Sequence, residues 1–179
     1  EVTLNVTDYA GKWNIDTMWV HVMLEANPPT TTDDYDDLWH TMDFTITLNA
    51  TDDFNGVAET YYKINDGPTL NVSAHGQPLI TTESANNTLE YWSVDINDNE
   101  EIPHHILTDI KLDKTSPTIS ITSPSDGAEV RSSPMIVWNG ADATSGIDHY
   151  EIRLDDGSWI NVGTNTTYTF TGVDDGSHT

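Results

Sequence analysis

The sequence predicts an all-β protein built from two tandem β-sandwiches and one additional hairpin. Helical periodicity is nearly absent, whereas Thr, Val, Ile, Tyr and Trp alternate with polar residues in short runs. Clusters of Gly, Pro, Asn and Asp separate these runs, as turns separate the short strands of a sandwich. The length of 179 residues is enough for one large domain or for two sandwich domains.

The composition excludes several classes of protein. The 30 acidic and six basic residues give a formal net charge of −24, which argues against a nucleic-acid partner because phosphate contacts need clustered Lys and Arg. We expect no membrane span, since the sequence has no run of about 18 apolar residues. The absence of Cys excludes disulfides and thiolate metal sites. No nucleophile motif, phosphate loop or zinc helix is present, so we expect no enzymatic activity.

Residues 1–24 are expected to form a terminal β-hairpin whose turn is Tyr9-Ala-Gly-Lys12. Apolar and polar residues alternate in both arms, so each arm is predicted to be a half-buried strand, although nothing N-terminal is available for them to pack on. The apolar side chains that share one face of each arm are the candidate intersubunit contacts: Val2, Leu4, Val6, Met18, Val20, Val22 and Leu24.

The rest of the chain divides at two short linkers. The first linker, at residues 25–32, precedes a sandwich at 33–113, and the second, at 114–117, precedes a sandwich at 118–179 that lacks its last strands. In the first sandwich we expect strands at 42–51, 56–65, 69–73, 79–81, 88–95 and 105–112. In the second we expect strands at 118–122, 135–139, 147–154, 159–162 and 168–170.

The two sandwiches are internal repeats. Residues 52–67 align without a gap on residues 142–157, at an offset of 142 − 52 = 90 residues. The linker prolines Pro29 and Pro117 repeat at 117 − 29 = 88 residues.

The hairpin fits the same period. Its turn at Asp8 resembles the turn at Asp95 of the first sandwich. If another copy of the chain followed directly, its Asp8 would fall at position 187, and 187 − 95 = 92 residues. The hairpin is therefore predicted to be the missing end of the second sandwich, displaced by one period.

About six apolar side chains of the hairpin would be buried in such a sandwich, for on the order of 10–15 kcal/mol as an upper bound. This rivals the roughly 5–15 kcal/mol that stabilises a whole domain. The hairpin that completes the second sandwich can come from three places. The chain can be one period of a tandem array, in which the next period supplies it. It can be a subunit whose hairpin completes a neighbour by strand donation, or a circular permutation whose hairpin folds back onto its own chain. Either of the first two gives a filament.

Several segments resemble a known family. The repeat at residues 52–67, the segments 89–101 and 110–117 and the second-unit segment 143–155 are similar to immunoglobulin-like repeats of archaeal and bacterial cell-surface proteins. The resemblance implies two immunoglobulin-like sandwiches in a secreted or cell-surface protein of the adhesive, stalk or sheath type. The family's usual Ala-Gly-Asn turn is Asn97-Asp98-Asn99 here and Ala10-Gly11-Lys12 in the hairpin.

Aspartates at equivalent strand ends are candidate Ca²⁺ ligands. In the sandwich topology they are expected at one pole, with Asp33 and Asp34 nearby, and Ca²⁺ prefers six to eight such oxygen ligands. The alternative is that these residues only form Asx turns. The candidates are Asp52, Asp53, Asp95 and Asp98 in one cluster, and Asp142, Asp148 and a neighbouring copy's Asp8 in another.

Five Asn-x-Ser/Thr sequons are candidate glycosylation sites: Asn5, Asn49, Asn71, Asn86 and Asn165. Two functions remain open. One is a structural unit, with copies of itself as partners, in an extracellular filament, sheath or stalk. The other is an adhesive or glycan-binding module of a larger cell-surface protein.

Overall fold

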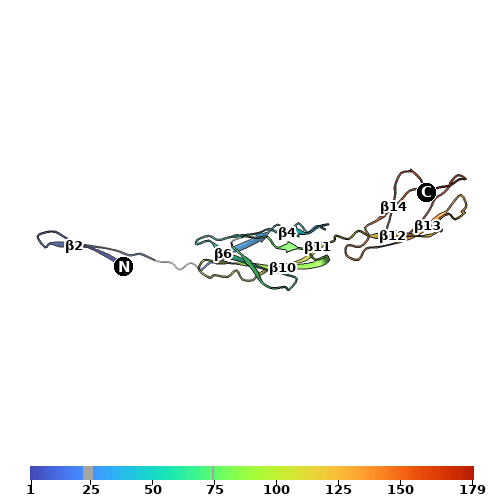
Figure 1. Ribbon diagram of the computed structural model, residues 1–179. Coiled ribbons are helices and arrows are strands. Elements are labelled where there is room, and N and C mark those ends of the chain that lie inside the picture. Colours follow the sequence, from blue (N-terminus) through green and yellow to red (C-terminus); the bar gives the residue numbers. More distant parts are fainter. Residues whose placement is uncertain (22–25, 74) are drawn as a thin grey trace.

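The computed structural model describes residues 1–21, 26–73 and 75–179, whose course is shown in Figure 1. All regular structure in these ranges is β-strand, arranged in several antiparallel sheets. Within the same ranges there is no helix that could cross a membrane. The all-β prediction is confirmed.

The N-terminal hairpin consists of β1 (Val2–Thr7) and β2 (Trp13–Met18), with Val2 opposite Met18 and Thr7 opposite Trp13. It stands apart from the other labelled strands in Figure 1. The expected second arm is too long, because β2 ends at Met18 and Val20 has no regular structure. Asn14 and Asp16 lie opposite Val6 and Leu4, so Met18 is the one apolar residue of β2 on that side, whereas Trp13 and Ile15 lie on the other side. Val22 and Leu24 lie outside the described residues.

The central unit, residues 30–113, contains two facing groups of strands. One sheet has the order β11-β10-β6-β7, and the others are β3-β5-β8 and β4-β9. The strands are β3 (Thr30–Asp33), β4 (Phe44–Thr45), β5 (Leu48–Thr51), β6 (Val57–Ile64), β7 (Leu70–Val72), β8 (His75–Gly76), β9 (Leu79–Ile80), β10 (Ser84–Asp95) and β11 (His105–Leu112). Residues 30–32 were expected in a linker, but they pair with β5 as part of β3, and Thr31 is buried.

The core of the central unit depends on the β10–β11 pair. The buried apolar cluster comprises Ile46, Leu48, Ile80, Leu89, Tyr91, Ile110 and Leu112. The last four of these residues come from β10 and β11. A unit of this type without that pair would lose more than half of its core residues.

A buried polar network joins the two groups of strands. The Glu101 carboxylate accepts the Thr31 backbone N–H at 2.8 Å, the Thr31 hydroxyl at 2.7 Å and the Ser93 N–H at 3.2 Å. Ser93 Oγ lies 2.7 Å from Thr31 Oγ1 and 2.8 Å from Thr60 Oγ1. Three strands, β3, β6 and β10, therefore meet at hydroxyl groups that satisfy one another inside the unit.

The C-terminal unit, residues 118–179, repeats the first part of this arrangement. Its sheets have the orders β12-β13-β16 and β14-β15. The strands are β12 (Thr118–Ser123), β13 (Met135–Ala141), β14 (Tyr150–Ile152), β15 (Ile160–Gly163) and β16 (Thr167–Thr169). The pairing of Glu151 with Asn161 reproduces that of Tyr61 with Asn71 at an offset of 90 residues. In this unit Trp138 is the one buried apolar side chain among the residues described.

A charged cluster lies on the surface of β10. The ring of His104 stacks on Trp92 at 4.0 Å, and its two nitrogens contact Glu90 at 2.7 Å and Glu100 at 3.0 Å. Burial of the ring lowers the pKa of His104, but the hydrogen bonds and charges of the two glutamates outweigh burial and raise this pKa above its usual value.

Because the His104 pKa is raised in the folded state, protonation of His104 stabilises the fold below its unfolded pKa of about 6.5, and this contribution is lost as the pH rises through the folded pKa. We expect the difference in melting temperature between the wild type and His104→Gln to be largest near pH 6 and to shrink toward pH 9. Taking the difference at each pH removes the titration of other groups. A difference that does not change with pH would contradict this assignment.

Candidate intersubunit interface

The apolar side chains of the N-terminal hairpin have no cover. Every residue of β1 and β2 is exposed, including Val2 at 53%, Leu4 at 71% and Val6 at 66%. Met18 and Val20, also predicted as contacts, are exposed as well. A two-stranded hairpin in isolation is at best marginally stable in water. These residues therefore form a surface that another structure is expected to cover.

The turn of the hairpin repeats the turn between β10 and β11. In both, the aspartate Oδ1 accepts the backbone N–H groups two and four residues later, at 2.9 and 2.8 Å for Asp8 and at 2.8 and 2.7 Å for Asp95. The N–H of each aspartate donates to the carbonyl four residues later, at 2.8 and 3.1 Å. The third residue after each aspartate has a positive φ, 79° at Gly11 and 66° at Asp98. The two hairpins therefore share one turn geometry.

This shared turn aligns the strands. At the offset of 95 − 8 = 87 residues, Val2, Leu4 and Val6 correspond to Leu89, Tyr91 and Ser93. These three residues of β10 all face the interior of the central unit and are 0–2% exposed. The apolar face of β1 therefore matches the core-facing side of β10, as a strand with a buried face requires.

The C-terminal unit is open on the side where β10 and β11 lie in the central unit. Strand β6 pairs with both β7 and β10, whereas its counterpart β14 pairs with β15 alone in the part of the chain that the structure describes. Ile119 lies opposite Gly140, and Ile121 opposite Trp138, so both isoleucines point to the side of the buried Trp138. They are nevertheless 67% and 65% exposed. Sequence reasoning named the expected strands at 147–154 and 168–170 as possible acceptors of the hairpin but singled out neither Ile119 nor Ile121, although the 90-residue offset from the central core could have found them.

The predicted calcium-binding aspartates bind backbone amides. Asp52 Oδ1 accepts the N–H groups two, three and four residues later at 3.1, 3.0 and 2.8 Å, and Asp142 Oδ1 does the same at 3.0, 2.8 and 2.9 Å. Each turn ends in a glycine with positive φ, Gly56 or Gly146. With the turns at Asp8 and Asp95, all four recurring aspartates therefore cap turns at strand ends.

The structure brings only part of the first predicted cluster together. The Ile96 N–H donates to the Gly56 carbonyl at 3.2 Å, so the turns at Asp52 and Asp95 are in contact. Asp53 and Asp98 are exposed, and Asp53 lies 3.5 Å from the Asn27 amide. Asp148, of the second cluster, is an exposed partner of His149.

Asp33 and Asp34 were expected beside this cluster, and that expectation is wrong. Strand β3 runs antiparallel to β5, so Thr30 lies opposite Thr51, next to Asp52, whereas Asp33 lies opposite Leu48 at the other end. The acidic loop that follows Asp33 therefore lies away from the turn at Asp52.

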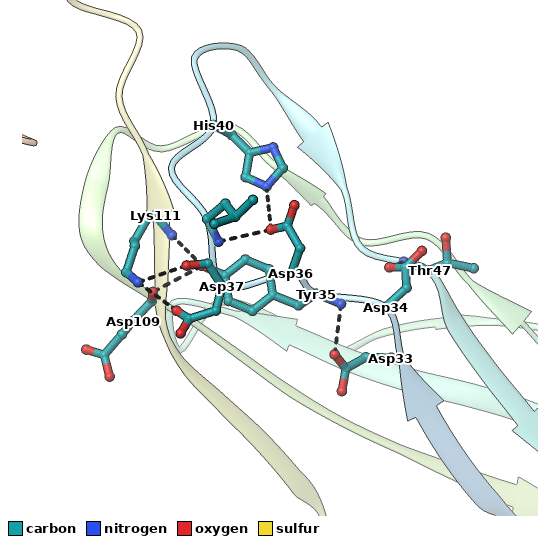
Figure 2. A network of polar contacts seen from close by, with 10 residues as sticks. Asp33, Asp34, Tyr35, Asp36, Asp37, His40, Thr47, Asp109 and Lys111 are labelled. Carbon is teal, nitrogen blue, oxygen red and sulfur yellow. Dashed lines mark hydrogen bonds and ion pairs between the residues drawn. The ribbon is translucent and has the colours of Figure 1, made fainter.

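Figure 2 shows how this acidic loop is held. The Asp34 carboxylate accepts the Thr47 N–H at 2.7 Å, and the Lys111 ammonium contacts Asp37 at 2.6 Å. The Leu38 N–H and His40 donate to Asp36 and lower its pKa, and the bond to Asp37 raises the pKa of Lys111. These carboxylates already accept hydrogen bonds, and the contact of Asp37 with Lys111 anchors the loop to β11.

The described residues contain no group of three or more Asp, Glu or His side chains arranged to hold a metal ion. Asp52 Oδ2 is buried and has no hydrogen-bond partner in the structure. A calcium site at the aspartate turns stays a prediction.

All five sequon asparagines are exposed, as glycan attachment requires. Asn5, Asn49 and Asn71 lie in β1, β5 and β7, whereas Asn86 lies in β10 and Asn165 lies between β15 and β16. Asn5 is on the face of β1 opposite to Leu4, so a glycan there would leave the apolar face free.

Comparison with known families confirms the resemblance for the C-terminal part of the chain. Residues 117–179 match the family model of the bacterial Ig domain, so this segment is a bacterial Ig-like domain. Domains of this kind are typical of cell-surface proteins. No curated protein matches the chain.

The two interpretations of the aspartates predict different responses to chelation. If they bind Ca²⁺, added Ca²⁺ raises the melting temperature and EDTA lowers it, because a ligand that binds only the folded state stabilises it. If they only cap turns, the melt is the same in EDTA and Ca²⁺, while Asp142→Ala still destabilises its unit by about 1–3 kcal/mol through the lost hydrogen bonds. Melting curves of the wild type and Asp142→Ala in both buffers separate these outcomes.

Proposed function

We propose that this chain is a structural repeat unit of an extracellular filament, sheath or surface stalk. In this assembly both units are immunoglobulin-like sandwiches, and the N-terminal hairpin of one copy completes the C-terminal unit of a neighbouring copy. One observation carries the proposal. The hairpin has the turn of the β10–β11 pair and, on β1, an apolar face that matches the core-facing side of β10, and the C-terminal unit exposes its apolar side where such a pair would pack.

The energetics favour such a pairing. Covering Val2, Leu4 and Val6 on the hairpin, and Ile119 and Ile121 on the acceptor, is worth roughly 1.5–3 kcal/mol for each side chain as an upper bound. The new strand pairing also satisfies backbone groups along the edge of β14. Together these gains are comparable with the roughly 4–15 kcal/mol that association of two molecules costs.

The geometry of donation favours linear growth. The donated surface is at the N-terminus and the acceptor surface is in the C-terminal unit, so each contact joins unlike surfaces. Interfaces of this heterologous kind produce rings when the rotation closes and filaments when it does not. Tandem covalent repeats and strand donation between separate subunits both produce this arrangement.

The charge of the chain predicts how assembly responds to salt. At −24 per copy, neighbouring copies repel one another through their acidic surfaces. Salt screens this repulsion, since the Debye length falls to about 3 Å at 1 M. Assembly is therefore strengthened at high ionic strength, as suits an acidic extracellular protein.

An extracellular, cell-surface location is part of the proposal. The bacterial Ig-like match and the five exposed sequons support it. Calcium at the aspartate turns and glycans at Asn5, Asn49, Asn71, Asn86 and Asn165 would be accessory features of such an assembly. Under the alternative, an adhesive or glycan-binding module, the purified chain stays monomeric and binds sugar.

A pair of matched variants tests the proposal. Leu4→Asp and Thr3→Asp each add one carboxylate to β1, the first on the apolar face and the second on the polar face. We expect the wild type and Thr3→Asp to form polymers in high salt, and Leu4→Asp to remain monomeric, because a buried unpaired carboxylate costs several kcal/mol. Size-exclusion chromatography with light scattering and electron microscopy measure the outcome.

Polymers of Leu4→Asp that match those of the wild type would contradict a role for the apolar face of β1. A wild type that is monodisperse at all salt and protein concentrations, and that binds glycan, would favour the adhesive module.

A further inference from the structure

Three hydroxyl-bearing residues of the polar network in the central unit are replaced by Ile119, Tyr150 and Val6 in the C-terminal unit and the hairpin. Strand pairing defines the correspondence. Thr31 lies opposite Ala50 as Ile119 lies opposite Gly140, and Ala50 and Gly140 are 90 residues apart. Ile119 of the C-terminal unit therefore takes the place of Thr31.

The second position is on β14. Thr60 of β6 lies opposite Val72, and at the offset of 90 residues it corresponds to Tyr150, which lies opposite Gly163 at the bulge of the β14–β15 pair. The third position is on the strand between them. Ser93 lies opposite Thr60, and the shared turn geometry makes Val6 of the hairpin its counterpart.

The exchange is chemically consistent. In the central unit the hydroxyls of Thr31, Ser93 and Thr60 contact one another at 2.7 and 2.8 Å. Ile119, Val6 and Tyr150 cannot reproduce that chain of hydrogen bonds, but they can pack together as an apolar cluster. Ile119 and Val6 are 67% and 66% exposed in the chain as it stands, so each lacks the neighbour that this cluster supplies.

Tyr150 already occupies the position that this cluster requires. Its ring makes an edge contact with Trp138 at 5.7 Å, and its hydroxyl lies so close to Gly140 that a Cβ there would be 2.6 Å from it. In the central unit, Ala50 corresponds to Gly140 and Thr60 corresponds to Tyr150. The larger side chain of Tyr150 on β14 therefore occupies the space that becomes free when β13 has Gly140 in place of an alanine.

We infer that β1 of one copy pairs antiparallel with the free edge of β14 in a second copy, with Val6 opposite Tyr150 and Leu4 opposite Ile152. This inference rests on the proposed function and specifies its contact. Val6 packs between Ile119 and Tyr150, where Ser93 stands between Thr31 and Thr60. On the outer face Asn5 lies opposite Glu151, as Trp92 lies opposite Tyr61.

The apolar cluster also makes the pairing selective. A hairpin with Val6 placed in the central unit would leave the buried Thr31 hydroxyl without Ser93, and a buried hydroxyl that loses its partner destabilises the fold. Conversely, β10 placed on the C-terminal unit would bury Ser93 between two apolar residues. Each hairpin is therefore suited to its own unit, and an exchange between the two units is disfavoured.

The register is tested by disulfide formation, since the chain has no Cys of its own. Two single variants, Asn5→Cys and Glu151→Cys, are mixed as full-length chains in high salt and oxidised. We expect a covalent heterodimer, because residues opposite each other in antiparallel strands are within about 5.5 Å at Cα and a disulfide tolerates about 7 Å. The matched control mixes Thr3→Cys with His149→Cys. In the inferred register Thr3 lies opposite Arg153, so these cysteines would be roughly 13 Å apart along the strand.

The outcomes separate the register from the proposed function. Crosslinking of the Asn5–Glu151 pair alone supports the register. Polymers that crosslink only through the control pair, or through neither pair, overturn the register but leave the filament intact. If the double variant Asn5→Cys/Glu151→Cys stays monomeric and forms the disulfide within one chain, the hairpin folds back onto its own C-terminal unit. This outcome would contradict the inference that the partner is a second copy. Absence of any assembly overturns the proposed function itself.

The apolar cluster around Val6 is tested by the critical concentration for polymerisation. Val6→Ser is expected to raise this concentration at least tenfold, whereas Thr7→Ser, on the polar face, is expected to change it less than twofold. Combining Val6→Ser with Ile119→Thr restores the pair of hydroxyls that Thr31 and Ser93 form in the central unit and is expected to recover part of the loss. Val6→Ser polymers with an unchanged critical concentration would overturn the apolar cluster.

Discussion

A strand with one apolar face must have that face covered, and this constraint governs the whole molecule. The central unit meets it within itself, because β10 and β11 supply four of the seven residues of its buried cluster. The C-terminal unit repeats the preceding strands but buries only Trp138 in the described part of the chain. The N-terminal hairpin has the opposite deficiency, since its apolar face is not covered by any sheet of the described residues. Each part of the chain lacks what the other offers.

The two units have diverged at the place where this closure occurs. In the central unit the contact between the strand groups is polar and includes the buried Glu101, which accepts bonds from Thr31 and Ser93. At the positions of Thr31 and Ser93, the C-terminal unit has Ile119 and the hairpin has Val6, which are both apolar. A contact that is permanent within one unit keeps every group of a hydrogen-bonded network paired. Such a network destabilises the fold only when some of its buried groups are left without partners. A contact formed between copies is better served by an apolar surface, whose exposure before assembly leaves no buried polar group unpaired.

Sequence reasoning anticipated the strands well where alternation and repeats reinforced each other. The 90-residue repeat correctly predicts the turns at Asp52 and Asp142 and the strands that flank them, and the resemblance of the turn at Asp8 to the turn at Asp95 is visible in the sequence. It failed where a strand is short and polar, since Thr30–Thr32 looks like a linker yet forms β3. It also placed Asp33 at the wrong end of the sheet, because the direction of β3 relative to β5 is not visible in composition. The network around Glu101 was missed, since it joins residues up to 70 positions apart with no local signal.

The central claim is that the hairpin of one copy and the edge of β14 in another protect each other. Amide hydrogen exchange of the full chain, measured below and above the concentration at which it polymerises, tests this most directly. The backbone N–H groups of β1 and of β14 should exchange rapidly in the dilute chain and gain protection together on assembly, while β6 and β10 stay protected throughout. Rapid exchange of β1 in polymers whose other strands are protected would contradict the claim.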